Sequence, residues 1–318
     1  MPSKVVVMST STYARGWYLV AWSAELVVGQ VKPVNAFGKA FVLYRGEDGV
    51  PVLLDAHCPH LGAHLGFGGR VQGSSIVCPF HGWRFGNTGR CVEVPYATRI
   101  PPRAAVGAYR VTEHSGMVLM FNAPAEGGPD YQVPALPEVG APAWTPLQVA
   151  EIEVRTQPRE VIENIADVAH FRPVHNTKID DFQVIIDGPR ATQRSLGKGR
   201  NLRGEKIDVL SIATYHGPGV QFTELAWAYP MWLINAHLPI DEERLLLRFG
   251  VTLRAGEGVT LPPEILEAHV AAARNGYFED VAIWEHKRYR EKPILADGDG
   301  PIGKVRAWYA AFFTEASA

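Results

Sequence analysis

Two short cysteine–histidine pairs constrain the fold of this 318-residue chain more than any other feature. The sequence reads Cys58-Pro-His60, then seventeen residues, then Cys78-Pro-Phe-His81. Each pair places a thiolate and an imidazole on one tight loop, so the two loops together offer four metal ligands. The surrounding residues 12–123 are rich in short β-branched runs separated by glycine turns. This pattern predicts a small all-β domain that carries a metal group.

The ligand set favours an iron–sulfur cluster. Two cysteines on one iron and two histidines on the other are the ligands of a Rieske [2Fe–2S] centre, in which the neutral imidazoles raise the reduction potential. Structural zinc is the alternative, because zinc also accepts two cysteines and two histidines. Zinc fingers, however, group cysteine with cysteine and histidine with histidine. Outside the pattern, Cys91 is expected to be a buried small hydrophobe, and His57 and His64 are expected not to bind the metal.

The rest of the chain differs in character. A Pro-rich stretch over residues 124–146 predicts an extended connection, and residues 147–318 then contain several strand-like runs. Helix patterns run from Pro158 to about His170 and from Pro262 to about Tyr289, and a last amphipathic piece covers 304–313. The predicted class is α+β: an N-terminal all-β Rieske domain, then a C-terminal antiparallel sheet with flanking helices, a helix-grip-like catalytic domain.

A second group of possible metal ligands lies at the end of the first helix pattern. Asp167 and His170 are three residues apart and would share a helix face, and Pro173 should end or kink the helix. His175 can then turn back toward His170. Two histidines and a carboxylate form the facial triad of non-haem Fe(II) oxygenases. Alone this is a weak signal, because a capped helix end explains it equally well, but the upstream cluster motif favours a second iron site.

Both motifs resemble those of Rieske non-haem iron oxygenases. Trp83 follows the Cys-x-His…Cys-x-x-His string, and Asn164-x-x-Asp167-x-x-His170-x4-His175 is similar to the motif of the monooxygenase and demethylase type. The resemblance implies that His170 and His175 bind the mononuclear iron. It also implies that Asn164 and Asp167 are catalytic residues.

In that family the aspartate bridges an iron-bound histidine and a cluster histidine of the neighbouring subunit. Carried over, Asp167 would accept a hydrogen bond from His170 and reach His81 of a second copy. The resemblance also implies that Asp280, ahead of an Ile-Trp pair, is the third iron ligand. Glu279 and Glu285 are the alternatives on the same helix pattern.

Segments across most of the chain resemble the oxygenase subunits of 3-ketosteroid 9α-hydroxylases and related sterol-acting enzymes. This implies an enzyme that takes electrons from a ferredoxin reductase or a flavin/iron–sulfur reductase. The electrons would pass through the cluster to the Fe(II), which uses O₂ to hydroxylate an apolar, polycyclic, steroid-like substrate. It further implies a homotrimer, because a head-to-tail interface must close.

Two other functions remain open. Oxidative demethylases and desaturases that act on sterols or small aromatic compounds share these motifs. An iron–sulfur electron carrier is the non-enzyme alternative, but it leaves the second metal group unexplained.

Aromatic residues are frequent after the second metal motif, and they either line an apolar substrate pocket or fill the core. They are Phe182, Tyr215, Phe222, Trp227, Tyr229 and Trp232. No charged residue stands out as an anchor for a substrate carboxylate, although the sequence leaves Arg172, Arg190 and Arg194 open for that role.

Composition excludes other classes of protein. A net charge of −2 without a basic stripe gives no support for nucleic-acid binding. No window approaches ~18 uninterrupted apolar residues, so no transmembrane helix is expected. The three cysteines and the lack of a signal pattern predict a cytoplasmic protein.

Overall fold

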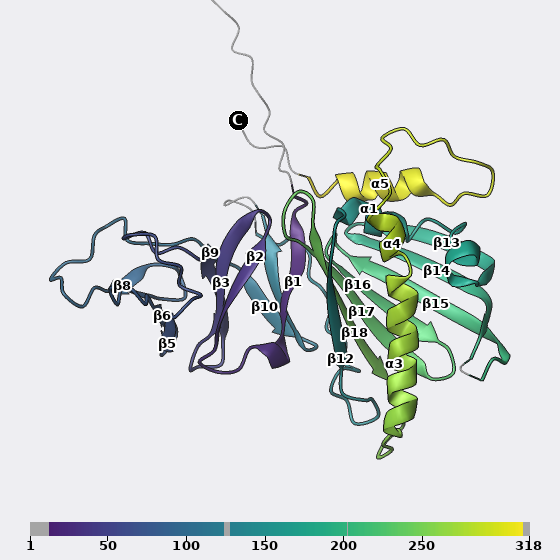
Figure 1. Ribbon diagram of the computed structural model, residues 1–318, viewed down its shortest axis with the longest axis horizontal. Helices are drawn as coiled ribbons and strands as arrows, with labels where there is room; N and C mark the ends of the chain where they lie inside the picture. Colours follow the sequence, from purple (N-terminus) through teal and green to yellow (C-terminus); the bar gives the residue numbers. More distant parts are fainter. Residues whose placement is uncertain (1–12, 124–127, 202, 314–318) are drawn as a thin grey trace, which may run out of the picture. The chain divides into compact units, whose positions relative to one another are not determined.

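The chain forms two structural units in the computed structural model, which describes residues 13–123, 128–201 and 203–313 (Figure 1). The first unit is Tyr18–Asn122, and the second joins residues 13–17 to the described residues from Ala123 onward. Strands dominate both units, and the α-helices of the described residues lie in the second. The predicted class, an all-β region followed by an antiparallel sheet with helices, is confirmed. No helix of the described residues is both long and apolar enough to cross a membrane.

The first unit consists of three small antiparallel sheets. One has the order β1-β11-β10, the second β2-β3-β4-β9 and the third β5-β6-β7-β8. Their bounds are β1 Gly16–Trp22, β2 Val31–Ala36, β3 Lys39–Arg45, β4 Pro51–Asp55, β5 Arg70–Gln72, β6 Ser75–Val77, β7 Arg84–Phe85, β8 Cys91–Glu93, β9 Ala108–Tyr109, β10 Val111–His114 and β11 Met117–Asn122, with the short 3-10 helix η1 at Ser23–Glu25.

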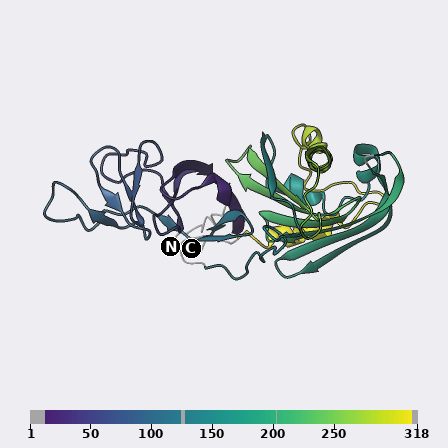
Figure 2. The ribbon, with the colours of Figure 1, turned by 90° about the horizontal axis from the view of Figure 1, so that it is seen from below.

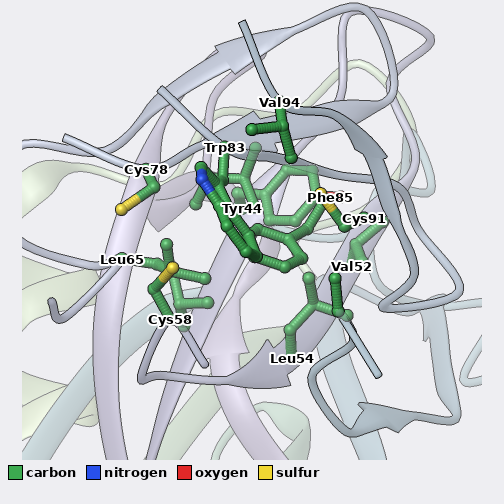
Figure 3. Packing of buried hydrophobic residues seen from close by; sticks show 13 residues of the cluster. Tyr44, Val52, Leu54, Cys58, Leu65, Cys78, Trp83, Phe85, Cys91 and Val94 are labelled. Carbon is green, nitrogen blue, oxygen red and sulfur yellow. The ribbon is translucent and has the colours of Figure 1, made fainter. Parts of the chain in front are cut away.

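A hydrophobic cluster joins the second and third sheets of this unit. Tyr44 and Leu54 from β3 and β4 pack with Leu65 and Phe85, all fully buried (Figure 3). Cys91 belongs to the same cluster, as expected of a small hydrophobe. The core therefore holds the loop after β4 and the loop between β6 and β7 against one packed body, and these are the two cysteine–histidine loops.

The second unit is built on a seven-stranded antiparallel sheet with the order β12-β18-β17-β16-β15-β14-β13. Every neighbouring pair is antiparallel, so the chain returns by short turns from β13 to β18, and β12 pairs with β18 at one edge. The bounds are β12 Gln148–Val154, β13 Lys178–Asp187, β14 Arg190–Arg200, β15 Lys206–His216, β16 Val220–Ala226, β17 Pro230–Pro239 and β18 Leu245–Leu253.

Helix α3, Pro263–Phe278, runs along one face of this sheet (Figures 1 and 2). Its Leu266, Val270 and Ala273 pack against a cluster that includes Leu233 and Val251 of β17 and β18. An antiparallel sheet packed against a long helix is the arrangement that the sequence analysis predicted for this part of the chain. The other helices are α1 Pro158–Glu163, α2 Phe171–His175, α4 Val281–Trp284 and α5 Ile302–Ala310.

Both long helices predicted from the sequence are interrupted. The first ends at Glu163 instead of about His170, so Asp167 and His170 lie in the connection to α2 and do not share a helix face. The second ends at Phe278 and resumes at Val281 as α4. The sequence pattern also missed β14. The two breaks and the missed strand all border the candidate site.

Candidate active site

The two cysteine–histidine loops share one hydrogen-bond pattern. In each loop the cysteine N–H donates to the carbonyl five residues later, at 2.9 Å for Cys58 and 2.8 Å for Cys78. A glycine four residues after the cysteine, Gly62 or Gly82, donates back to the cysteine carbonyl. Both glycines have positive φ, 78° and 73°, a conformation that a residue with a Cβ rarely adopts. The sequence therefore builds two equivalent loops that present their ligands alike.

The four side chains fit a Rieske cluster. Cys58 and Cys78 are buried, whereas the rings of His60 and His81 are partly exposed with centroids 4.7 Å apart. Burial, with a smaller contribution from Cys78, raises the pKa of the Cys58 thiol to about 11, and a bound metal would hold this sulfur as a thiolate. The buried Nδ1 of His60 has no hydrogen-bond partner among the described residues, and His60 stacks on Trp83. An orphaned imidazole nitrogen beside two buried thiols is what a ligand set shows.

In the second unit, the connection between α1 and α2 folds around Asp167. Its Oδ1 accepts backbone hydrogen bonds from Ala169 at 3.1 Å and His170 at 3.3 Å. These bonds occupy the N–H groups of Ala169 and His170, so the helix does not continue through His170. The adjacent His170 ring, together with these two N–H groups, lowers the pKa of the Asp167 carboxyl.

The hydrogen bond predicted between His170 and the Asp167 carboxylate is wrong. His170 Nδ1 lies 2.5 Å from the main-chain carbonyl of Asp167, whereas the carboxylate Oδ2 is 3.8 Å away, beyond hydrogen-bond range. A carbonyl can only accept, so Nδ1 donates and Nε2 keeps the lone pair that a metal needs. The Asp167 side chain is 40% exposed and keeps one oxygen available.

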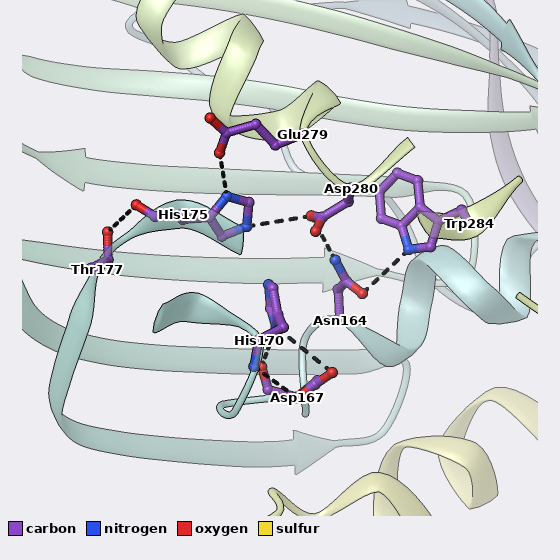
Figure 4. A network of polar contacts seen from close by, with 8 residues as sticks. All are labelled: Asn164, Asp167, His170, His175, Thr177, Glu279, Asp280 and Trp284. Carbon is purple, nitrogen blue, oxygen red and sulfur yellow. Dashed lines mark hydrogen bonds and ion pairs between the residues drawn. The ribbon is translucent and has the colours of Figure 1, made fainter. Parts of the chain in front are cut away.

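The His175 ring lies between two consecutive acidic residues (Figure 4). Its Nδ1 is 2.7 Å from Glu279 Oε2, and its Nε2 is 3.5 Å from Asp280 Oδ2. Burial alone would disfavour the charged ring, but the contacts with Asp280 and Glu279 outweigh it and raise the pKa of His175. Asn176 ends α2 in a left-handed conformation, φ 49°, and so turns the chain into β13.

Asn164 connects the end of α1 to the break between α3 and α4. Its Nδ2 donates to Asp280 Oδ2 at 2.7 Å, and its Oδ1 accepts from Trp284 Nε1 at 3.3 Å (Figure 4). Trp284 and Asp280 are buried. Asn164 therefore fixes one oxygen of the Asp280 carboxylate, and the tryptophan fixes the amide.

Three side chains from separate segments meet at this point. One ligand atom from each of His170, His175 and Asp280 lies within 4.8 Å of the other two. Two nitrogens and one carboxylate oxygen at this spacing suit Fe(II) with open coordination positions. Of the two alternatives to Asp280 as the third ligand, Glu279 contacts Nδ1 of His175, the ring nitrogen opposite the one that faces Asp280. Glu285 accepts a bond from the backbone of Arg155 instead.

A cavity of about 810 Å³ opens on these residues. Its lining comprises the three residues of the triad, one face of the sheet and α3. Of the aromatic residues that the sequence analysis considered for a substrate pocket, Tyr215 and Trp227 line this cavity. Tyr277 and Trp284 line it as well. The other aromatic residues and the three arginines considered above do not line it: Phe182, Phe222, Tyr229, Trp232, Arg172, Arg190 and Arg194. The volume falls in the range of ligand pockets, roughly 300–1,000 Å³.

Two family models match consecutive parts of the chain. Residues 16–109 match the Rieske [2Fe-2S] domain, and residues 120–313 match the 3-ketosteroid 9alpha-hydroxylase C-terminal domain. Together with the two groups of ligands, these matches define a Rieske-type non-haem iron monooxygenase. Its cofactors are a [2Fe–2S] cluster and a mononuclear iron.

Known relatives agree with this class. A probable 3-ketosteroid-9-alpha-monooxygenase, oxygenase component, from Rhodococcus rhodochrous is 35% identical over 95% of this chain and 80% of the relative. Cholesterol 7-desaturase from Caenorhabditis elegans is 29% identical over 96% of this chain and 78% of its own length. The chain therefore belongs to the 3-ketosteroid 9α-hydroxylase family of Rieske oxygenases. The fold is also that of dicamba monooxygenase bound to dicamba, with a TM-score of 0.77 at 20% identity over 96% of this chain and 98% of the other.

Proposed function

We propose that this chain is an oxygenase component that hydroxylates a steroid-like polycyclic substrate with O₂ and electrons from a reductase. The observation that carries the proposal is the cavity of about 810 Å³ that contains the side chains of His170, His175 and Asp280. A large cavity beside a facial triad brings a bulky substrate to the place where an iron activates O₂. The relatives named for 3-ketosteroids and cholesterol support the substrate class.

Each side chain has a definite task in this proposal. His170, His175 and Asp280 would hold the iron, and Cys58, His60, Cys78 and His81 the cluster. When bound, the cluster supplies single electrons and the iron supplies oxygen activation. Asn164 positions the Asp280 carboxylate, and the Asp167 carbonyl fixes the tautomer of His170. The aromatic rings of Tyr215, Tyr277 and Trp284 would pack against an apolar ring system.

Desaturation of a sterol is the second candidate reaction. The relative named cholesterol 7-desaturase supports it at 29% identity. Hydroxylation and desaturation both begin from the same iron site, so analysis of the products distinguishes the two.

We also propose a head-to-tail homotrimer, a partner ferredoxin reductase or flavin/iron–sulfur reductase, and the cytoplasm as the compartment. Support for the trimer comes from the exposed oxygen of Asp167 and from the partly exposed His81, which would meet across an interface between copies. Leu61, Phe67 and Phe80, which flank the cluster histidines, expose 60–66% of their surface and would be covered there. The three free cysteines suit a reducing compartment.

Iron counting and product analysis test the proposal. Anaerobically purified protein should contain about three irons per chain, and NADH, a surrogate reductase and a steroid panel should give a hydroxylated product. His170→Ala should retain about two irons and the colour of the cluster but form no product, whereas His286→Ala, an exposed histidine, should behave like the wild type. Turnover by His170→Ala would refute the iron site.

A further inference from the structure

A tryptophan is connected to one of the proposed iron ligands. The indole N–H of Trp284 donates to Oδ1 of Asn164 at 3.3 Å, and Nδ2 of the same amide donates to Oδ2 of Asp280 at 2.7 Å (Figure 4). The backbone N–H of Trp284 also donates to the carbonyl of Asp280 at 2.9 Å. Two separate hydrogen-bonded paths therefore join the indole to the residue that would hold the iron.

Trp284 lies beside the proposed iron site and is almost closed to water. It lines the cavity together with the triad, and only 3% of its surface is exposed. Of the side chains that line this cavity, tryptophan and tyrosine lose a single electron most readily. The described lining contains two of each, Trp227 and Trp284, and Tyr215 and Tyr277. Their surroundings decide which of the four an oxidant at the iron would oxidise.

The two tyrosines lack an acceptor for a proton. Oxidised tyrosine is a strong acid, so tyrosine gives up an electron easily only when its phenolic proton can leave. The ring of Tyr277 is 6.1 Å from that of Trp284, but its hydroxyl is buried without a hydrogen-bond partner among the described residues. Tyr215 is 2% exposed, so water offers its proton no acceptor either. Release of a proton into such surroundings is costly.

The indole of Trp284 can keep its proton when it is oxidised. Its N–H points to the amide oxygen of Asn164, which accepts a hydrogen bond but is not a base. The bond from Asn164 to Asp280 holds the amide in this orientation. A hydrogen bond from a charged donor is about twice as strong as one from a neutral donor, so the same bond would stabilise the indole cation radical. Trp284 therefore can lose an electron without a proton transfer.

Trp227 lines the same cavity without this connection. Its indole N–H donates to the carbonyl of Arg200 at 3.1 Å, and its side chain is partly exposed. Among the described residues, no hydrogen bond joins it to Asn164 or to the triad. Because the two tryptophans share one cavity but differ in these contacts, Trp227 is an internal reference for Trp284.

We propose that Trp284 supplies an electron to the iron site when oxygen is activated there without a substrate to oxidise. This inference rests on the iron site of the proposed function but not on the identity of the substrate. Hydrogen peroxide is O₂ after its reduction by two electrons and two protons, so it serves as the oxidant. One Fe(II), one Trp284 indole, one H₂O₂ and two protons from the solvent give one Fe(III), one indole cation radical and two H₂O. An electron from the reductase then restores the indole.

Freeze-quench EPR of the anaerobic holoenzyme tests the proposal, with the iron ferrous, the cluster oxidised, no substrate present and peroxide added. The wild type should give an organic radical whose hyperfine splitting changes with ring-deuterated tryptophan but not with ring-deuterated tyrosine. Trp284→Phe should lose this radical, whereas Trp227→Phe, the matched control, should retain it. His170→Ala should also lose it, because it lacks a ligand of the iron that accepts the electron.

Peptide mapping after repeated additions of peroxide gives a second readout. In the wild type, added oxygen atoms should lie mainly on Trp284, although radicals that diffuse from solution would favour the more exposed Trp227. In Trp284→Phe the electron must come from elsewhere, so the added oxygen should move to the rings of His170 and His175.

A radical that persists in Trp284→Phe or in His170→Ala, or one that responds to deuterated tyrosine, would overturn the proposal. Iron-loaded wild type without a radical, or added oxygen mainly on Trp227, would do the same. The mononuclear iron is counted in every sample, so a wild type that lacks it would refute the proposed iron site and not the choice of Trp284. If Trp284→Phe does not fold or does not bind iron, the wild-type radical and peptide map still decide.

Discussion

At the scale of single residues, two consecutive acids contact opposite nitrogens of one imidazole. Glu279 lies 2.7 Å from Nδ1 of His175, and Asp280 lies 3.5 Å from Nε2. A hydrogen bond from Nδ1 to Glu279 leaves Nε2 with its lone pair on the side of the triad. In the proposed iron site, Glu279 would therefore position the His175 ring, and Asp280 would be a ligand.

We expect Glu279→Ala to weaken Co²⁺ binding at the triad about 10–100-fold, which is the usual effect of removing a partner of a metal-bound histidine. Glu279→Gln retains an acceptor for Nδ1 and should stay within a few-fold of the wild type. Absorbance titration of protein depleted of the mononuclear iron measures both affinities. Glu267→Ala, an exposed glutamate on α3, is the control. Equal affinities for Glu279→Ala and the wild type would contradict the assignment.

His237 predicts how stability depends on pH. It is 1% exposed, and its Nε2–H donates to the carbonyl of Pro218 at 2.6 Å. Burial lowers its pKa to about 4, from about 6.5 in the unfolded chain. Between these values the unfolded chain binds the proton and the folded one does not. Stability is therefore fully present above about pH 6.5 and is lost as the pH falls toward 4, by at most about 3 kcal/mol.

Urea denaturation at several pH values measures this loss. His237→Gln keeps a donor for Pro218 but does not titrate, so its stability should fall less between pH 6.5 and 4. His286→Gln removes an exposed histidine and should keep the wild-type slope. His216, whose pKa burial also lowers to about 4, should maintain part of the acid sensitivity in both variants. If the stability of His237→Gln fell with pH as steeply as that of the wild type, this would contradict the lowered pKa of His237.

At the scale of elements, the connection between α1 and α2 depends on a close backbone approach. A Cβ at Gly300 would lie 1.7 Å from the carbonyl oxygen of Ala166, which precedes Asp167. Only glycine allows the segment before α5 to lie against the connection that carries His170.

Gly300→Ala should therefore displace this connection and lower the free energy of unfolding by roughly 1–3 kcal/mol. It should also reduce the mononuclear iron while the two cluster irons remain, because the cluster ligands lie in the other unit. Iron analysis and thermal melting report the two effects. Gly303→Ala, within α5 and without a neighbour within 4 Å, is the matched control. Full iron content in Gly300→Ala would contradict the prediction, because it would show that the segment between α1 and α2 retains the iron site despite the added Cβ.

The elements that the sequence did not predict have a common physical origin. Strand β14 turns polar Gln193 and Ser195 toward the cavity, so it lacks the apolar alternation that marks a half-buried strand. The first predicted helix does not reach His170, because the Asp167 side chain bonds the N–H groups of Ala169 and His170. Polar side chains of the candidate site thus replace the apolar residues whose spacing would otherwise predict a strand or a helix.

The proximity of the candidate ligands was easier to predict than the contacts around them. Cys58 and His60, like His170 and His175, are close in sequence, so spacing alone brings each pair together. Asp280 is 105 residues beyond His175 and was indicated only by the family resemblance. Asp280 is positioned by a hydrogen bond from Asn164, whose amide in turn accepts one from Trp284. These contacts depend on the packing of α1 against α4, which no local sequence pattern predicts.

At the scale of the whole molecule, the two groups of metal ligands lie in separate units. A head-to-tail trimer predicts that two different inactive variants restore each other. His170→Ala lacks the iron site and Cys78→Ser lacks the cluster. A trimer mixed from both has one interface that joins an intact cluster site to an intact iron site. Purified mixed trimers should therefore recover about a third of wild-type turnover, one active interface in three.

Coexpression of the two variants with different affinity tags, followed by purification through both tags, isolates the mixed trimers for the assay. Coexpression of His170→Ala with His175→Ala is the control, because that pair has no intact iron site and should stay inactive. No recovery in the first pair, with trimers confirmed by light scattering, would place both functional sites within one subunit.

The order of the ligands along the chain also sets the order in which the two metal centres can be completed on the ribosome. The proposed cluster ligands span residues 58–81, whereas the proposed iron triad would require residue 280, and the close approach of Gly300 to Ala166 lies beyond it. During synthesis the first unit can therefore acquire its metal while the second is still incomplete. A ribosome stalled near residue 200 should carry a coloured nascent chain with no bound mononuclear iron.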